Sequence, residues 1–73
     1  MTITVKTDWS HWLIEAGNLL PGSQIRIINV PSGLTNNERC SEMNKALRVA
    51  YPNKNLRAYW HGLFYVYYEA IIK

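Results

Sequence analysis

Hydrophobic and polar residues follow two different periods along this chain, and each change of period marks a new element. Thr2 to Lys6 alternates threonine with isoleucine and valine, which predicts a short strand. Apolar residues then recur at steps of three and four, as on one face of a helix. These residues are Trp9, Trp12, Leu13, Ala16, Leu19 and Leu20. Asp8 suits the start of this helix because its carboxylate can accept hydrogen bonds from free amides, and Pro21-Gly22 suits its end.

The middle of the chain repeats the order of strand and helix. Gln24 to Val30 is apolar and β-branched on both faces, which is typical of a central strand. Thr35 and Glu38 then have the spacing of a capping box, in which each residue's side chain bonds the other's backbone amide. We expect the second helix from about Asn36 to Tyr51, ended by Pro52-Asn53. Its inward residues would be Cys40, Met43, Leu47, Ala50 and Tyr51.

The segment from Leu56 to Ile72 fits two structures. Six of the nine aromatic residues lie between positions 59 and 68. A helical stripe fits Leu56, Trp60, Leu63, Phe64, Tyr67 and Ile71. Aromatic and β-branched residues favour strands, however, and His61-Gly62 offers a turn that accommodates positive φ. We therefore predict two strands joined at His61-Gly62 and keep a continuous helix as the alternative.

Together these elements predict a single α+β domain over residues 1–73, in the order βαβαββ. The four strands would form one sheet with the hairpin at its centre, and right-handed crossovers would place both helices on one face. Alternation would turn Phe64, Val66, Tyr68, Ala70 and Ile72 toward the helices. A two-residue turn would pair Trp60 with Leu63, Ala58 with Tyr65 and Leu56 with Tyr67 on the open face. The predicted partner-binding residues are Arg26, Ile28, Lys54, Arg57, Trp60, Tyr65 and Tyr67.

Residues 25–70 resemble the first half of an RNA-recognition motif. The run Ile25-Arg26-Ile27-Ile28-Asn29-Val30 resembles the family's first-strand signature, and the run from His61 to Tyr68 resembles its longer signature. The resemblance implies a strand–helix–strand–strand order and a sheet that binds single-stranded RNA. Only Tyr65 matches a base-stacking aromatic position, since Arg26 and Leu63 occupy the other two. We therefore take from the resemblance a geometry more than an activity.

Composition narrows the class of protein. A chain of 73 residues has room for one domain, and 48% hydrophobic residues suffice for a core. Its one cysteine excludes an internal disulfide, and no signal peptide or membrane-spanning segment is recognisable. We expect a soluble, cytoplasmic protein with no membrane partner. Residues 31–73 carry six Lys and Arg against three Glu, a net +3 that favours an acidic partner or nucleic acid.

The ingredients of catalysis are sparse. Cys40 falls on the predicted inward stripe, where cysteine is usually an inert hydrophobic residue. His11, His61 and Cys40 lie on three different elements without metal-ligand spacing, and no glycine-rich phosphate loop is present. We predict no catalytic residue, no metal and no cofactor. The nearest enzymatic alternative is a small ribonuclease that uses His61 and Arg57.

The sequence thus favours a non-enzymatic binding protein that docks an aromatic and basic sheet face on a protein partner. In size and style, though not in any motif, it resembles the small inhibitors that bacteriophages make against host machinery such as RNA polymerase. The alternative is a single-strand nucleic-acid binder, in which Tyr65, Tyr67 and Trp60 stack on bases. Arg26, Arg57 and Lys54 would then meet phosphates. A homodimer whose aromatic faces bury each other is the third expectation.

Overall fold

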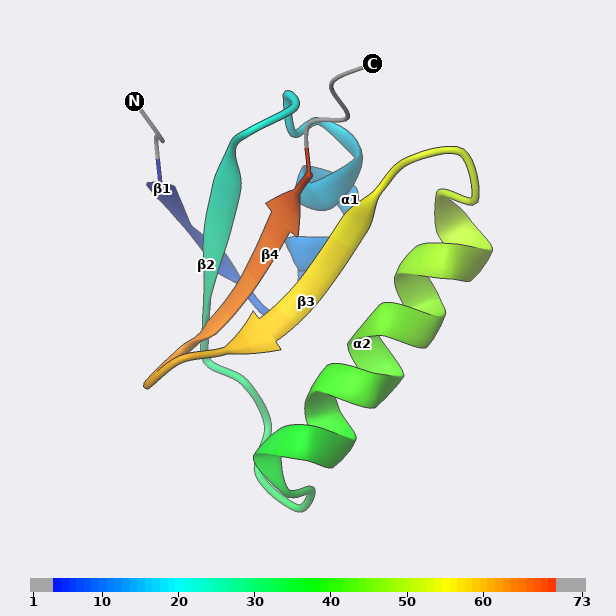
Figure 1. Cartoon of the computed structure of the whole chain (residues 1–73). Helices are drawn as coiled ribbons and strands as arrows, with labels where there is room; N and C mark the ends of the chain where they lie inside the picture. The colour runs from blue at the N-terminus through cyan, green and yellow to red at the C-terminus, as the bar shows by residue number, and fades with distance from the viewer. Residues whose placement is uncertain (1–3, 70–73) are drawn as a thin grey trace.

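The predicted order of elements is confirmed in a computed structural model, which describes residues 4–69. The elements are β1 (Thr4–Asp8), α1 (Trp12–Gly17), β2 (Gln24–Ile28), α2 (Asn36–Ala50), β3 (Leu56–Trp60) and β4 (Phe64–Tyr68), as drawn in Figure 1. The C-terminal segment is therefore a hairpin and not a helix. The predicted strand contacts of Ala70 and Ile72 lie outside the described residues, as do Thr2 and Ile3 of the predicted first strand.

The four strands form one mixed sheet in the order β1-β2-β4-β3. β1 is parallel to β2, whereas β4 is antiparallel to both β2 and β3. β2 and β3 therefore run in the same direction, with β4 inserted between them. Only β4 of the hairpin lies inside the sheet; β3 forms one edge and β1 forms the other.

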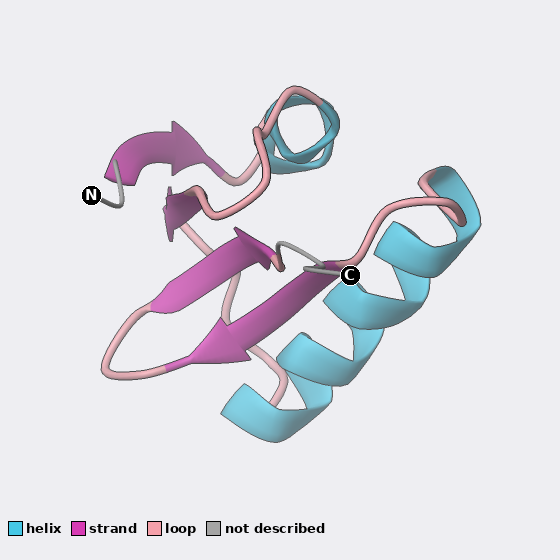
Figure 2. Ribbon diagram, turned by 45° about the horizontal axis from the view of Figure 1, so that its top comes forward, coloured by secondary structure: helices cyan, strands magenta, loops and turns pink. Residues whose placement is uncertain are grey.

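Both helices cover the same face of the sheet, as the sequence predicted. Their buried side chains join those of the strands in one hydrophobic core, because alternate strand residues point to a single face. The core residues are Trp12, Ala16, Ile25, Ile27, Met43, Leu47, Ala58 and Val66. In Figure 2 the two helices flank this side of the strands. Neither helix has the length and apolar composition needed to cross a membrane, as judged over residues 4–69.

The start of α2 is fixed by the predicted capping box. The Glu38 amide donates to Thr35 Oγ1 at 3.2 Å, and the Thr35 amide donates to Glu38 Oε1 at 3.1 Å. The Thr35 backbone amide, together with its side chain, lowers the pKa of the Glu38 carboxyl. Two amides that the first turn would leave unpaired are thus satisfied by side chains.

Two details of the helices differ from the prediction. α1 begins at Trp12 and not directly after Asp8, because Asp8 ends β1 and its carboxylate bonds Ser10 in the intervening turn. α1 also ends at Gly17, so Leu20 leaves the helical stripe and is 72% exposed. In α2, Met43 and Leu47 are buried as predicted and Cys40 and Tyr51 are partly buried. Ala50, in the last position of the helix, faces solvent.

The register of the hairpin corrects the predicted faces. Trp60 pairs with Phe64 and Ala58 with Val66, so the loop has three residues, His61, Gly62 and Leu63. The His61 amide donates to the Leu63 carbonyl at 2.9 Å, and Gly62 takes a φ of 75°. One extra loop residue shifts the pairing by one, which turns every side chain of β3 to the other face. Trp60, Ala58 and Leu56 therefore lie on the helix side.

Candidate partner-binding face

The sheet face turned away from the helices carries two rows of side chains in register. One row runs across β1, β2, β4 and β3 as Lys6, Arg26, Tyr65 and Tyr59. The second row runs in the same direction as Thr4, Gln24, Tyr67 and Arg57. We call these eight residues the open face. Ile28 lies on the same side of the sheet, beside Asp8 at the end of β1.

Five of the seven residues predicted to bind a partner lie on this side of the sheet. They are Arg26, Ile28, Arg57, Tyr65 and Tyr67. Trp60 lies on the helix side at the end of β3, where it is 47% exposed. Lys54 lies in the loop before β3, and its Nζ donates to the Gly17 carbonyl at 2.7 Å. The structure therefore separates these two residues from the other five.

Sequence reasoning did not place Tyr59, Lys6 or Gln24 on this surface. Tyr59 was missed because the predicted two-residue turn exchanged the faces of β3. Lys6 and Gln24 were missed because no local sequence pattern indicates how β1 pairs with β2. In the structure the two strands are parallel, with Lys6 opposite Arg26. The sequence also allowed a three-residue loop centred on Gly62, since such loops are common in hairpins. That loop would have placed Tyr59 on the open face.

The tyrosines and their neighbours are held in place by contacts across the strands. The rings of Tyr59 and Tyr65 stack with centroids 5.2 Å apart and planes inclined by 16°. The Tyr59 hydroxyl donates to Gln24 Oε1 at 2.6 Å, and Gln24 Nε2 donates to Thr4 Oγ1 at 3.0 Å. Burial, followed by the proximity of Tyr65 and Tyr67, raises the pKa of the Tyr59 hydroxyl. These contacts connect all four strands and fix the surface before any partner arrives.

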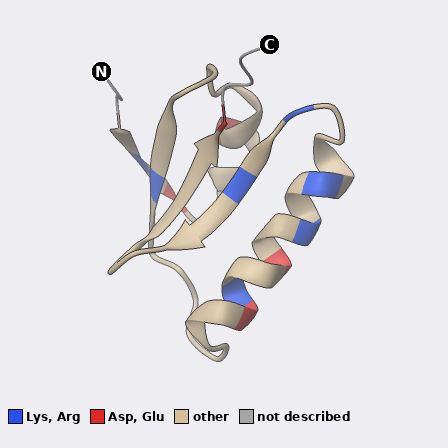
Figure 3. Ribbon diagram, viewed as in Figure 1, with Lys and Arg blue, Asp and Glu red and all other residues tan. Residues whose placement is uncertain are grey.

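The cations of the open face have no carboxylate partner within the described residues. Figure 3 shows one basic residue on each of β1, β2 and β3. Over residues 4–69 the ion pair that forms within 4.0 Å joins Lys45 to Glu42 on α2, away from this face. Arg26 Nε is moreover buried without a hydrogen-bond partner in the described part of the chain. A buried donor without a partner is costly, because it has given up its hydrogen bond to water.

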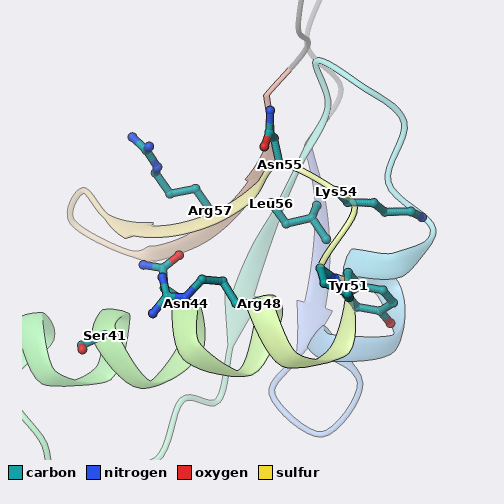
Figure 4. Close-up of a pocket in the computed structure, with 9 residues that line it drawn as sticks. Ser41, Asn44, Arg48, Tyr51, Lys54, Asn55, Leu56 and Arg57 are labelled. Carbon is teal, nitrogen blue, oxygen red and sulfur yellow. The ribbon is translucent and has the colours of Figure 1, made fainter.

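A groove of about 690 Å³ lies between the C-terminal half of α2 and β3 (Figure 4), and three of the polar side chains that line it are already bonded. Asn44 bonds the backbone of Ala58, and the Tyr51 hydroxyl donates to the Leu13 carbonyl at 2.7 Å. Lys54 is bonded to Gly17. In Figure 4 the side chain of Arg57 points away from α2. The cations around this groove therefore do not converge on one point.

The reactive side chains are dispersed. Burial raises the pKa of the Cys40 thiol, which keeps it protonated. His11 Nδ1 lies 2.9 Å from Ser10 Oγ, whose own hydrogen bond goes to Asp8 Oδ2 at 2.6 Å. Serine stands between the acid and the histidine, so the histidine is not placed between them as a relay requires. Within residues 4–69 no group of three or more histidine, cysteine and acidic side chains gathers to hold a metal ion.

Comparison with known proteins gives no match to a family model, a curated sequence or a solved structure.

Proposed function

We propose that this protein is a non-enzymatic binding protein whose open face docks on an acidic surface of a protein partner. The observation that carries the proposal is that one sheet face holds three tyrosines and three cations, and that these cations lack carboxylate partners among the described residues. Tyrosine and arginine are enriched at interface centres because they combine large apolar area with polar ends. Such docking would make the protein a regulator or inhibitor that acts by covering its partner's surface, as small phage inhibitors of transcription do.

The tyrosine stack favours a protein over a nucleic acid. A base-binding platform needs aromatic rings whose faces are free to stack on bases. Tyr59 and Tyr65 turn ring faces toward each other at 5.2 Å, so one face of each ring is already covered. Their edges and hydroxyl groups remain for contacts with a folded surface.

The second candidate function is binding of single-stranded RNA or DNA. It is supported by the basic character of the face and by Tyr67, which lies beside Arg57 and outside the stacked pair. The chain order of β2, α2, β3 and β4 is also the strand–helix–strand–strand order that the resemblance to an RNA-recognition motif implies. In this alternative Tyr67 and the outer face of Tyr65 would stack on bases.

A salt titration separates the two functions. A labelled single-stranded oligonucleotide is titrated with the protein at low and at physiological salt. Phosphate contacts release counterions, so affinity that depends on them falls steeply as salt rises. We expect weak oligonucleotide binding that disappears at physiological salt. Sub-micromolar binding that survives physiological salt and is abolished by Tyr65→Ala would overturn the protein-docking proposal in favour of the nucleic-acid one.

Capture from lysate then tests the protein partner. The tagged chain is incubated with nuclease-treated lysate, alongside Arg26→Ala, Arg57→Ala and Lys45→Ala variants. Lys45→Ala is the matched control because this substitution removes one positive charge from α2, away from the open face. We expect a captured protein that the Arg26 and Arg57 variants lose and the Lys45 variant keeps. Equal capture by all three variants would show that the open face is not the docking surface.

A further inference from the structure

The two edges of the sheet differ in whether another strand can join them. β3 is one edge, and Asn44 of α2 bonds the middle of it. Asn44 Nδ2 donates to the Ala58 carbonyl at 3.0 Å, and the Ala58 amide donates to Asn44 Oδ1 at 2.8 Å. One side chain thus occupies both backbone groups that Ala58 turns away from β4. Since α2 runs alongside β3 in Figure 1, this edge is closed to strand addition.

The β1 edge keeps its backbone groups available. The Trp9 amide donates to the Ile28 carbonyl at 2.9 Å, which continues the parallel register of Val5 with Ile25. Because alternate residues bond to opposite sides of a strand, Thr4 and Lys6 turn their amides and carbonyls outward. No backbone hydrogen bond joins these outward groups to residues 4–69. They form a free template for a strand of another chain.

The side chains around the β1 edge indicate which side chains an added strand should have. Lys6 lies on the open face at this edge, and Arg26 lies beside it on β2, one strand further in. Val5 points to the opposite face and is 55% exposed. It borders a hollow of about 250 Å³ whose apolar lining includes Leu19, Leu20 and Ile25, and Leu20 is 72% exposed. A strand laid beside β1 would place alternate residues over these two environments.

We propose that the β1 edge binds an extended peptide segment with alternating acidic and apolar residues. Backbone hydrogen bonds to Thr4 and Lys6 supply the attachment, and the alternating side chains supply the specificity. Acidic residues lie beside Lys6, with Arg26 one strand further in, and apolar residues cover Val5 and the hollow beside Leu20. The peptide site at the β1 edge shares Thr4, Lys6 and Arg26 with the open face, but the proposal does not depend on the tyrosine contacts of that face.

A second copy of this chain fits the same edge less well. Antiparallel pairing of two β1 strands about Lys6 would bring like charges directly opposite each other, which is unfavourable. Shifting the register to pair Lys6 with Asp8 would use a carboxylate that Ser10 and Asn29 already bond at 2.6 Å each. Charge complementarity therefore selects an acidic partner strand over self-association.

NMR with a synthetic peptide tests the proposal. The probe is an end-blocked eight-residue peptide that alternates glutamate with valine, titrated into the ¹⁵N-labelled full chain. We expect shifted amide signals and slowed hydrogen exchange at Thr4 and Lys6, with no change at Leu56. Lys6→Glu should weaken binding roughly tenfold, because one attractive contact becomes repulsive, whereas Lys45→Glu should leave it unchanged. A peptide with lysine in place of glutamate, and one N-methylated along its bonding edge, should both fail to bind.

Three results would overturn the proposal. The first is absence of any change at Thr4 and Lys6 at millimolar peptide. The second is a set of changes confined to Arg57, Tyr65 and Tyr67, which would place the peptide on β3 and β4 and away from the β1 edge. The third is slow exchange of the Lys6 amide that grows with protein concentration before peptide is added, which would assign the edge to a second copy. None of these results depends on the oligonucleotide and capture experiments above.

Discussion

Asp8 ties the end of β1 to the end of β2 through its carboxylate. Oδ1 accepts from Asn29 Nδ2 at 2.6 Å, and Oδ2 accepts from the Ser10 hydroxyl at 2.6 Å and from the Ser10 amide at 2.9 Å. Asn29 donates this bond from the left-handed region, at a φ of 60°. These hydrogen bonds, that of the Ser10 hydroxyl foremost, lower the pKa of the Asp8 carboxyl from 3.8 to about 2.

A depressed pKa makes the contribution of Asp8 to folding depend on pH. The ionised form is favoured in the folded state, so its stabilisation is complete above the unfolded pKa of 3.8 and is lost as pH falls toward about 2. Asn29→Gly keeps the positive φ but removes the donor, so the Asp8 pKa should rise. An NMR titration of the Asp8 carboxyl carbon measures this pKa in the wild-type protein and in the Asn29→Gly variant. A wild-type value near 3.8 would contradict the hydrogen bonding described here.

Gly17 ends α1 against the ring of Tyr51, and this approach leaves no room for a side chain. A Cβ at position 17 would lie 2.4 Å from the Tyr51 hydroxyl oxygen and 2.6 Å from Cζ. The ring cannot move freely because its hydroxyl is bonded to the Leu13 carbonyl. Gly17→Ala should therefore destabilise the fold by about 1–3 kcal/mol. Urea denaturation measures the change, with the substitution Val49→Ala at an 81% exposed site as control.

At the scale of elements, the contact between α2 and the β3 edge depends on Asn44. Asn44→Ala leaves the Ala58 amide and carbonyl without their partner, which should cost about 1–3 kcal/mol. Asn44→Asp retains an acceptor for the amide but no donor for the carbonyl, and should be intermediate. Denaturant unfolding of the three proteins gives this ranking. The alanine variant should also self-associate at high concentration, as gel filtration would detect, because the Ala58 amide and carbonyl at the β3 edge then lack a partner.

Elements whose signals are local in sequence were predictable, and pairings between distant segments were not. The capping box of Thr35 and Glu38 sets the start of α2 to the residue, and the period of α2 identified Met43 and Leu47. Which side chains of β3 face the helices depends on whether Leu63 belongs to the loop or to β4. No local sequence pattern decides between these two possibilities. The open face could be predicted in part only, because the neighbours of Lys6 and Gln24 belong to other strands.

At the scale of the whole molecule, the two faces of the sheet should respond differently to substitution. Val66 and Leu47 are at most 1% exposed, between sheet and helices. Leu47→Ala should cost about 2–5 kcal/mol through lost burial and the cavity left behind. Arg57→Ala, on the exposed face, should change stability by no more than about 0.5 kcal/mol. Thermal unfolding measured by circular dichroism compares the stability of the two variants. An equal loss of stability in both would contradict our assignment of the faces.

The position of β4 between β2 and β3 has a consequence for synthesis of the chain on the ribosome. β3 emerges before β4 but has no neighbour in the sheet until β4 follows it, since β2 and β3 do not touch as strands. A nascent chain halted after Trp60 should therefore expose the apolar strands and stay sensitive to protease. Resistance should appear only once residues through Tyr68 have left the exit tunnel. The ribosome thus makes β4 last, after β2 and β3, the two strands that β4 connects in the sheet.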